Sequence, residues 1–489
     1  MASSQNNNNE NEISSKKLKE LFKDGEDISF REIQINGITI HVVFIDGLVN
    51  NITTSDYILK PLFQDRRFSF SRNELEIIKL IQAGTIYFSS QNTRNNISDV
   101  VLDVLDGSTA LIFDREKTAI TFNNKSLYTR AITEPSGENV IKGSKDTFVE
   151  TLRVNTATIR RKIKSENLKI QNMIIGERTQ TFIDVFYMDN IVNKLMLEEL
   201  KQRLSKIKVD GVLTTGFIEE FIVEERSTLF PQIIYTERPD KFCADLIEGY
   251  IGIIVDGIPL GLIMPATLLQ CLQAPEDYAQ NHIVSSLIRY MRFNLMLLTL
   301  VLPAFYTALT TFHQEMIPSK LALSIQASKE GVPFPSFIEV LFMLASFEIL
   351  VESAIRLPKT IGQAISIVGA IVVGQAAVEA KLVSPAVVVV IALTAISSFS
   401  MPNQDFANVL RVWRFIFVIL SSILGLCGLT LGLLVLLTHL ASIEVLGVPY
   451  LAPFVSGEYK NLDDSIFRCL LPFQKKRPKE LSTQDEKRR

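Results

Sequence analysis

The sequence predicts a soluble α/β domain of two lobes, followed by an all-α polytopic transmembrane domain. The chain has 489 residues, too many for one simple core, and 47% of them are hydrophobic. Its first half is polar and alternates short β-branched runs with amphipathic runs, which is typical of an α/β fold. Its second half contains several long runs without a charged residue, which favour membrane helices.

The composition changes divide the chain into five expected regions. Residues 1–28 form a disordered arm, 29–138 the first α/β lobe, 139–285 the second lobe, 286–442 the transmembrane helical domain, and 443–489 an amphipathic segment with a basic tail. The first residues are polar and Asn-rich, without the apolar run of a signal peptide. The N-terminal domain is therefore expected on the cytoplasmic side of a membrane.

In the first lobe, period-2 alternation and turn pairs predict strands, and amphipathic runs predict helices. The strands are Ile38–Ile45, Ala110–Asp114 and Ala119–Phe122, and the helices are Glu74–Gln82 and Asn96–Leu105.

The second lobe is expected to open with a basic helix over Asp146–Lys164. Its charged face is interpreted either as a solvated surface or as a contact for lipid headgroups or a partner. A helix over Val192–Ile207 and strands over Ile183–Tyr187, Ile251–Ile254 and Leu260–Met264 follow.

The membrane half begins near residue 286. Phe293–Phe312 is free of charge for 20 residues, enough to cross a hydrocarbon core of about 30 Å. Arg289 and Arg292 precede it, and basic flanks favour the cytoplasmic side. The other candidate spans are Phe334–Arg356, Ile361–Val378, Leu382–Gln404 and Phe415–Thr438.

The number of crossings stays open between four, five and six. The two middle runs are either two spans or a re-entrant hairpin, because irregular backbone at membrane depth is tolerated where protein shields it. The basic C-terminal tail suits a cytoplasmic face, which together with a cytoplasmic N-terminal domain requires an even number of crossings.

The residue pattern gives little support to an enzyme. The four cysteines are far apart, and no zinc-ligand spacing, phosphate-binding loop, dinucleotide fingerprint or nucleophile elbow is present. We therefore expect no catalytic, cofactor or metal site. The formal net charge of −3 argues against nucleic-acid binding.

Carboxylates at membrane depth are the first candidate functional residues. Glu348, Glu352 and Arg356 follow one another at four-residue steps and share a helix face. One interpretation is a cation path or gate lined by Glu348 and Glu352. The other is a structural Glu352–Arg356 ion pair, with Glu348 tied to a neighbouring helix.

A second stripe predicts a pore with an apolar constriction. Gln375 and Glu379 lie four residues apart, and Val368 and Val372 continue the same face. The opposite face carries small residues that favour helix packing instead. Pro333 and Pro335 bracket a tight turn and are the candidate hinge.

Motifs spread over most of the chain carry a family resemblance. In the first half they are Asp46-Gly47-Leu48-Val49, Phe148-Val149-Glu150, Asn155, Arg160-Arg161, Phe230-Pro231-Gln232, Thr236-Glu237-Arg238-Pro239-Asp240 and Asp256-Gly257. In the second half they are Pro303-Ala304-Phe305-Tyr306, Met316-Ile317-Pro318, Gly331-Val332-Pro333-Phe334-Pro335 and Gly447-Val448-Pro449-Tyr450. With these motifs the chain resembles the A subunits of GerA-family spore germinant receptors. It departs from the family pattern at Met343-Leu344 and Val351-Glu352, where relatives usually carry Met-Glu and Arg-Glu.

The resemblance implies a multi-pass protein of the spore inner membrane. It implies a transporter-like B subunit and a lipoprotein C subunit as partners, and a homo-oligomer, with a pentamer as the expected form. Such an oligomer would be a nutrient-gated cation channel. The alternatives are a non-conducting scaffold, a transporter that binds the nutrient itself, and a related paralogue group of the same membrane.

Overall fold

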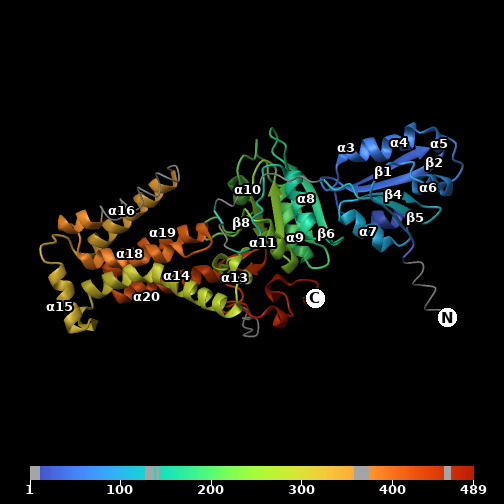
Figure 1. Ribbon diagram of the computed structural model, residues 1–489. Coiled ribbons are helices and arrows are strands. Elements are labelled where there is room, and N and C mark those ends of the chain that lie inside the picture. The colour runs from blue at the N-terminus through green and yellow to red at the C-terminus, as the bar shows by residue number, and fades with distance from the viewer. Residues whose placement is uncertain (1–10, 127–136, 139–141, 357–373, 456–463, 489) are drawn as a thin grey trace. The chain divides into compact units, whose positions relative to one another are not determined.

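The protein divides into two compact units in a computed structural model that describes residues 11–126, 137–138, 142–356, 374–455 and 464–488 (Figure 1). The first unit comprises Met1–Val223, Ile233–Pro265 and Lys475–Arg489, and the second comprises Glu224–Gln232 and Ala266–Gln474. Neither unit is continuous in the chain, since each contains a segment that lies within the sequence range of the other.

The first lobe of the first unit is a five-stranded antiparallel sheet of order β1-β2-β4-β5-β3. Its strands are β1 (Ile28–Ile35), β2 (Ile38–Ile45), β3 (Gln91–Arg94), β4 (Thr109–Phe113) and β5 (Thr118–Phe122). Its helices are α2 (Ser15–Leu21), α3 (Asn51–Thr53), η1 (Thr54–Leu59), α4 (Lys60–Gln64), α5 (Arg66–Ser69), α6 (Glu74–Gln82) and α7 (Ile97–Leu105).

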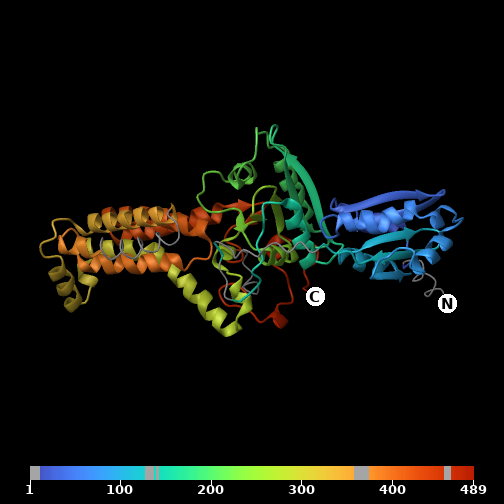
Figure 2. The same ribbon diagram turned by 45° about the horizontal axis from the view of Figure 1, so that its top comes forward.

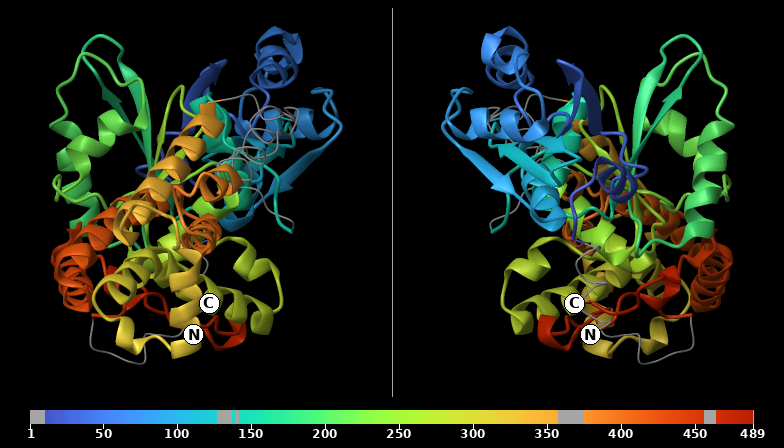
Figure 3. Two further views of the ribbon diagram at one scale, coloured as in Figure 1. Left: turned by 90° about the vertical axis from the view of Figure 1, so that its left-hand side faces the viewer. Right: turned by 90° about the vertical axis from the view of Figure 1, so that its right-hand side faces the viewer.

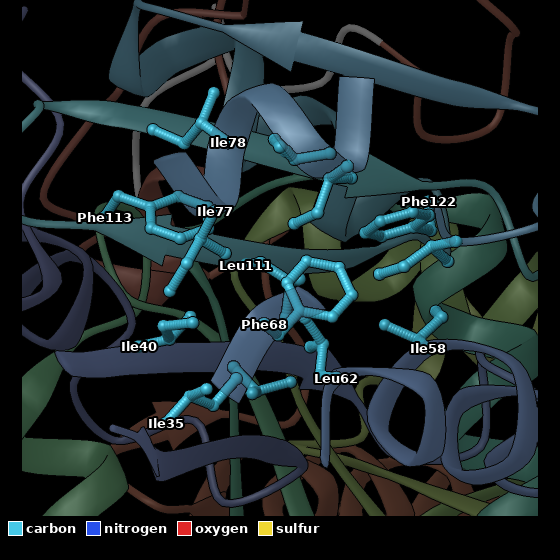
Figure 4. Packing of buried hydrophobic residues seen from close by; sticks show 14 of the residues in the cluster. Ile35, Ile40, Ile58, Leu62, Phe68, Ile77, Ile78, Leu111, Phe113 and Phe122 are labelled. Atoms are coloured by element: carbon cyan, nitrogen blue, oxygen red, sulfur yellow. The ribbon is translucent and has the colours of Figure 1, made fainter. Parts of the chain in front are cut away.

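Both faces of the central strand β2 are largely buried, and strand alternation explains how. In β2, Ile40, Val42 and Phe44 belong to one hydrophobic cluster. The intervening Val43 and Ile45 belong to a second cluster. The first cluster lies under η1 and α4–α6 (Figure 4), and the second under α2 and α7. Because β2 is buried on both faces, its sequence is a nearly continuous apolar run.

The second lobe repeats the arrangement of the first. Its antiparallel sheet, which is drawn in green to yellow-green in Figure 2, has the order β6-β7-β9-β10-β8. Each strand number is five higher than that of its counterpart in the first sheet. The strands are β6 (Leu168–Ile175), β7 (Thr181–Met188), β8 (Ile234–Thr236), β9 (Ile251–Val255) and β10 (Gly261–Met264). The helices are α8 (Leu152–Lys162), α9 (Lys194–Ser205), α10 (Thr215–Ile222) and α11 (Pro239–Glu248). The expected α/β fold is therefore confirmed, with antiparallel pairing in both sheets.

One turn shows the repeat at residue level. The helix before the fourth strand in chain order is α7 in the first lobe and α11 in the second, and each is followed by a glycine with positive φ. These are Gly107 (φ 91°) and Gly249 (φ 106°), and the next strand starts two residues later in both lobes. Glycine adopts this left-handed conformation without the steric cost of a Cβ atom.

A buried ion pair joins the lobes. Arg160 of α8 donates from Nε to Asp27 Oδ2 at 2.7 Å and from Nη2 to Oδ1 at 2.9 Å, and both side chains are at most 1% exposed. The lobes are also joined by a parallel backbone bridge between Gly25, two residues before Asp27, and Ile170 of β6. The helix predicted over Asp146–Lys164 is shorter than expected, and Arg160 is not on a solvated face.

The N-terminal arm also differs from expectation. Residues 1–10 lie outside the described residues, but Ser15–Leu21 form helix α2. Ile13, Leu18 and Phe22 are buried in the core of the first lobe. The prediction of disorder is wrong for residues 11–28. It rested on the polar composition of the arm and overlooked these three apolar residues, which pack into the core.

The second unit is a helical bundle built around a 30-residue helix, α14 (His282–Thr311). α14 packs along α18 (Pro385–Phe399), α19 (Gln404–Leu424), α20 (Leu426–Ser442) and α16 (Ser336–Arg356) (Figures 1 and 3). The remaining elements are α12 (Leu268–Leu272), α13 (Glu276–Ala279), η2 (Gln314–Met316), α15 (Ser319–Ser328), β11 (Glu444–Val445), β12 (Val448–Pro449) and η4 (Leu471–Phe473). In the first unit, η5 (Lys479–Leu481) follows.

The single span predicted over Phe415–Thr438 is wrong. Gly425 has φ 61° and ends α19, and α20 starts at the next residue and packs back against α19. Gly428 and Gly432 face Leu420 and Phe417, so the two helices approach closely along a small-xxx-small pair. The span was predicted because the run lacks charged residues. The pattern that indicates a hairpin is Gly425, Gly428 and Gly432.

Replacing Gly428 by alanine is expected to destabilise this hairpin. A Cβ atom at this position would lie 2.1 Å from the backbone oxygen of Leu420, which a rotamer change cannot relieve. Overpacking of this kind typically costs about 1–3 kcal/mol or more. Thermal unfolding of the purified chain in detergent measures the effect. Gly374→Ala is the matched control, because its nearest neighbour would lie at an ordinary 3.7 Å; equal melting temperatures for the two variants would contradict the close approach.

Candidate functional site

The candidate site is the set of polar groups within the helical bundle of the second unit. Of the predicted pore residues, Val368 and Val372 lie outside the described residues. Gln375 and Glu379 are exposed on a helical turn over residues 374–379, whereas Gly374 and Ala377 are buried on its other side. The pore-lining role of Gln375 and Glu379 stays a prediction.

Glu348 forms an ion pair with a neighbouring helix. Arg414 of α19 donates from Nη2 to Glu348 Oε1 at 2.5 Å, and Arg411 Nη1 lies 3.7 Å from Oε2. The Arg414 side chain is fully buried, and that of Glu348 is 25% exposed. Glu352, one turn further along α16, is exposed, and the side chain of Arg356 lies outside the described residues. The roles of Glu348 and Glu352 in a cation path stay predictions.

The arginine pair is a feature that the sequence reasoning missed. Two guanidinium groups face one carboxylate, which leaves one positive charge in excess among these three side chains. Arg411 Nε and Arg414 Nε and Nη1 are buried without a hydrogen-bond acceptor in the described part of the chain. Buried charges are retained only when they are paired. The signal in the sequence was two arginines three residues apart beside an apolar run.

Glu339 holds the start of a second helix. Its Oε2 atom accepts the backbone N–H of Ser384 at 2.7 Å, and Ser384 is the N-cap of α18. Lys329 Nζ lies 3.9 Å from Oε1 and also donates to Ser336 Oγ. Burial lowers the pKa of Lys329, and the Glu339 carboxylate acts in the opposite direction. A carboxylate at a helix N-terminus is favoured by the helix dipole, so Glu339 connects α16 to α18.

The predicted hinge lies in the link between α15 and α16. Pro333 and Pro335 are both exposed, and Gly331 at the start of the link has φ 86°. Such a link can absorb a change in backbone angle, and its function as a hinge stays a prediction.

Two family motifs that are far apart in the sequence meet in this unit. Phe230 packs against Tyr450, with ring centroids 5.9 Å apart, and also against Phe406 and His439. Thr228 Oγ1 lies 2.9 Å from His439 Nε2, and Leu268 donates its N–H to the Tyr450 carbonyl at 2.9 Å. The segment Glu224–Gln232, which lies in the chain between α10 and β8, is therefore an integral part of the helical unit.

Other family motifs meet in the second lobe of the first unit. The Asn155 side chain bonds to both the N–H and the carbonyl of Val149, at 2.8 and 2.6 Å. Asp256 Oδ1 accepts the N–H of Leu152 at the start of α8. In these contacts Asn155 and Asp256 hold the backbone that leads into α8.

Two helices in the described part of the chain are long and apolar enough to cross a membrane, by length and composition alone. They are α14 and α19, and the apolar helices α18 and α20 are shorter.

The comparisons define the class of protein. The family model for the Bacillus/Clostridium GerA spore germination protein matches residues 16–480, and the chain belongs to this family. This confirms the resemblance drawn from the motifs.

The chain is also similar to individual proteins. "Spore germination protein KA" of Bacillus subtilis (strain 168) is 39% identical over 94% of this chain and 85% of its own length. "Uncharacterized membrane protein YfkQ" of the same organism is 38% identical over 89% of this chain and 85% of its own length. The crystal structure of the N-terminal domain of the A subunit of the Bacillus megaterium spore germinant receptor GerK3 is 30% identical, with a TM-score of 0.42; the match covers 52% of this chain and 94% of that chain.

Proposed function

We propose that this chain is the A subunit of a spore germinant receptor and forms an oligomeric, nutrient-gated cation channel in the spore inner membrane. Its partners would be a transporter-like B subunit and a lipoprotein C subunit. The family match over residues 16–480 and the relatives named as germination and membrane proteins support this function. We expect no catalysis and no cofactor.

The distribution of side chains in the helical unit carries the proposal. Large apolar side chains more than half exposed cover its helices, among them Leu393, Ile396, Ile423, Leu434 and Val435. Charged side chains such as Glu339 and Arg414 are buried inside. Exposed apolar side chains of this size are unfavourable in water, whereas a lipid-embedded bundle requires them and keeps its charged groups inside.

The path is proposed to run along Val368, Val372, Gln375 and Glu379. Gln375 and Glu379 support this because they are exposed on one side of their turn and face away from the buried Gly374 and Ala377. In an oligomer that side can face a shared axis, where valines would form a constriction that opens when water enters it.

Cation flux from liposomes tests this function. The purified chain is reconstituted alone and with its B and C partners, and flux is recorded with and without candidate nutrients. Val372→Ala is expected to leak cations without nutrient, because a smaller side chain lowers the dewetting barrier. Val389→Ala on α18, where Val389 is 59% exposed, is the matched control and is expected to stay closed.

The same experiment separates the channel from a scaffold. A scaffold would show no flux from an intact oligomer under any condition, and it would tolerate Gln375→Leu if the protein still assembles. Such results would overturn the channel function.

A further inference from the structure

The first third of α14 has its arginines turned inward and its apolar side chains turned outward. Arg289 and Arg292 are 4% and 9% exposed, whereas Ile283, Leu287 and Tyr290 are 67%, 59% and 48% exposed. A surface helix of a soluble protein has the opposite arrangement. The outward side of this segment must therefore meet an apolar environment.

An ion network holds the arginines inside. Arg289 donates from Nε to Asp277 Oδ2 at 2.9 Å and from Nη1 to Asp464 Oδ1 at 2.8 Å. Arg292 donates to the same Asp277 carboxylate at 3.1 and 3.2 Å, and to the Leu272 carbonyl at 2.6 Å. Neither arginine is free to reach lipid headgroups, although both flank the charge-free run Phe293–Phe312.

Because Asp464 is part of this network, the chain that follows it is fixed beside α14. Phe467 stacks on Tyr290 with ring centroids 5.9 Å apart and an interplanar angle of 11°. Phe467, Leu471 and Phe473 are 61%, 58% and 70% exposed. Arg468, the one charged residue between 465 and 474, is 9% exposed and donates to the Gln280 carbonyl.

The Tyr290–Phe467 contact joins the outward side of α14 to the exposed apolar side chains that follow Phe467. The apolar surface is defined by Ile283, Leu287, Tyr290, Phe467, Leu471 and Phe473. We propose that this surface contacts lipid at the boundary between headgroups and acyl chains and anchors the second unit there. This proposal rests on the membrane placement in the proposed function.

The length of α14 supports lipid as the occupant. Thirty residues span about 45 Å, whereas the hydrocarbon core is about 30 Å thick, so about ten residues extend beyond it. The apolar surface occupies that extension and is continuous with exposed apolar side chains further along α14, such as Leu298 and Phe305. Aromatic and aliphatic side chains without exposed charge suit the interfacial zone.

Quenching by brominated lipids tests the proposal on the full chain in liposomes. Trp413 is the single tryptophan, so a Trp413→Phe background allows one reporter at a time. Tyr290→Trp and Phe473→Trp are expected to lose at least about twofold more fluorescence with bromine near the headgroup end of the acyl chain than with bromine near the methyl end. Met291→Trp, at a 52% exposed position, is a second reporter on the helix.

Two further reporters make the outcome decisive. Leu298→Trp lies eight residues beyond Tyr290, about 12 Å deeper along α14, and is expected to show the reverse depth preference. Tyr87→Trp, at a 90% exposed position in the first lobe, is expected to stay unquenched.

Quenching at residue 298 without quenching at 290, 291 and 473 would overturn the proposal in favour of a protein contact such as a second copy, and would leave the membrane placement intact. No quenching at 298 either would overturn both this proposal and the membrane placement.

Discussion

Asp27→Ala is expected to lower the stability of the first unit by about 3–5 kcal/mol, because it leaves the Arg160 guanidinium buried without its carboxylate. Among the described residues, the remaining hydrogen-bond partner of Arg160 is the Ser165 carbonyl at 3.2 Å, which cannot neutralise the charge. Since each 1.4 kcal/mol is a factor of ten, hydrogen exchange of the β1 and β6 amides in the full chain should accelerate by about 10²–10⁴-fold.

Two controls isolate the buried charge as the cause. Asp210→Ala removes a carboxylate that lies 3.7 Å from Arg178, in a pair whose side chains are 78% and 82% exposed. The free energy of opening measured by hydrogen exchange should then change by less than about 1 kcal/mol. Asp27→Ala combined with Arg160→Met should recover most of the loss, because a buried pair can be replaced by apolar groups. Wild-type exchange rates in Asp27→Ala alone would contradict the role of this pair in joining the lobes.

The elements that the sequence predicted correctly are those whose signal is local. β2 and α6 have the expected bounds because a turn pair follows β2 and an N-cap precedes α6; Asn73 accepts the N–H of Glu76. The family resemblance was also predicted correctly, since its motifs are short local segments. The repeated strand order of the two lobes escaped notice because the helices between equivalent strands differ in number and length.

The misassigned features depend on contacts between distant residues. Arg160 has the composition of a solvated helix face, and only Asp27, 133 positions earlier, makes it a buried residue. Arg289 and Arg292 were interpreted only as a basic flank of the charge-free run, and their inward ion pairs with Asp277 and Asp464 were not predicted. A single sequence gives the charge of such residues but not the partner that decides which way they face.

The candidate site was only partly readable for the same reason. The i,i+4 spacing gave the shared face of Gln375 and Glu379. The partners of Glu348 and Glu339, which are Arg414 on α19 and the Ser384 N–H at the start of α18, come from other helices and have no fixed sequence spacing to these carboxylates.

Glu348→Ala is expected to destabilise the helical unit by about 3–5 kcal/mol, because it leaves Arg411 and Arg414 facing each other without a carboxylate. Like charges in a medium of low dielectric repel strongly, and Arg414 has no route to solvent. Thermal unfolding of the chain in detergent and its yield in membranes measure the loss. Glu330→Ala, at an exposed carboxylate in the same unit, is the control and should leave both unchanged.

The double variant Glu348→Ala with Arg414→Met separates structure from conduction. It keeps the net charge of the three side chains at plus one and should recover most of the stability, since methionine fills the buried volume without a charge. Cation flux through the recovered protein then tests whether Glu348 lines the path. A flux equal to that of the unmodified chain would assign Glu348 to the α16–α19 contact alone, whereas a reduced flux with normal assembly would place its carboxylate on the cation path. Continued instability of the double variant would show instead that the Glu348–Arg414 pair is not what holds α16 to α19.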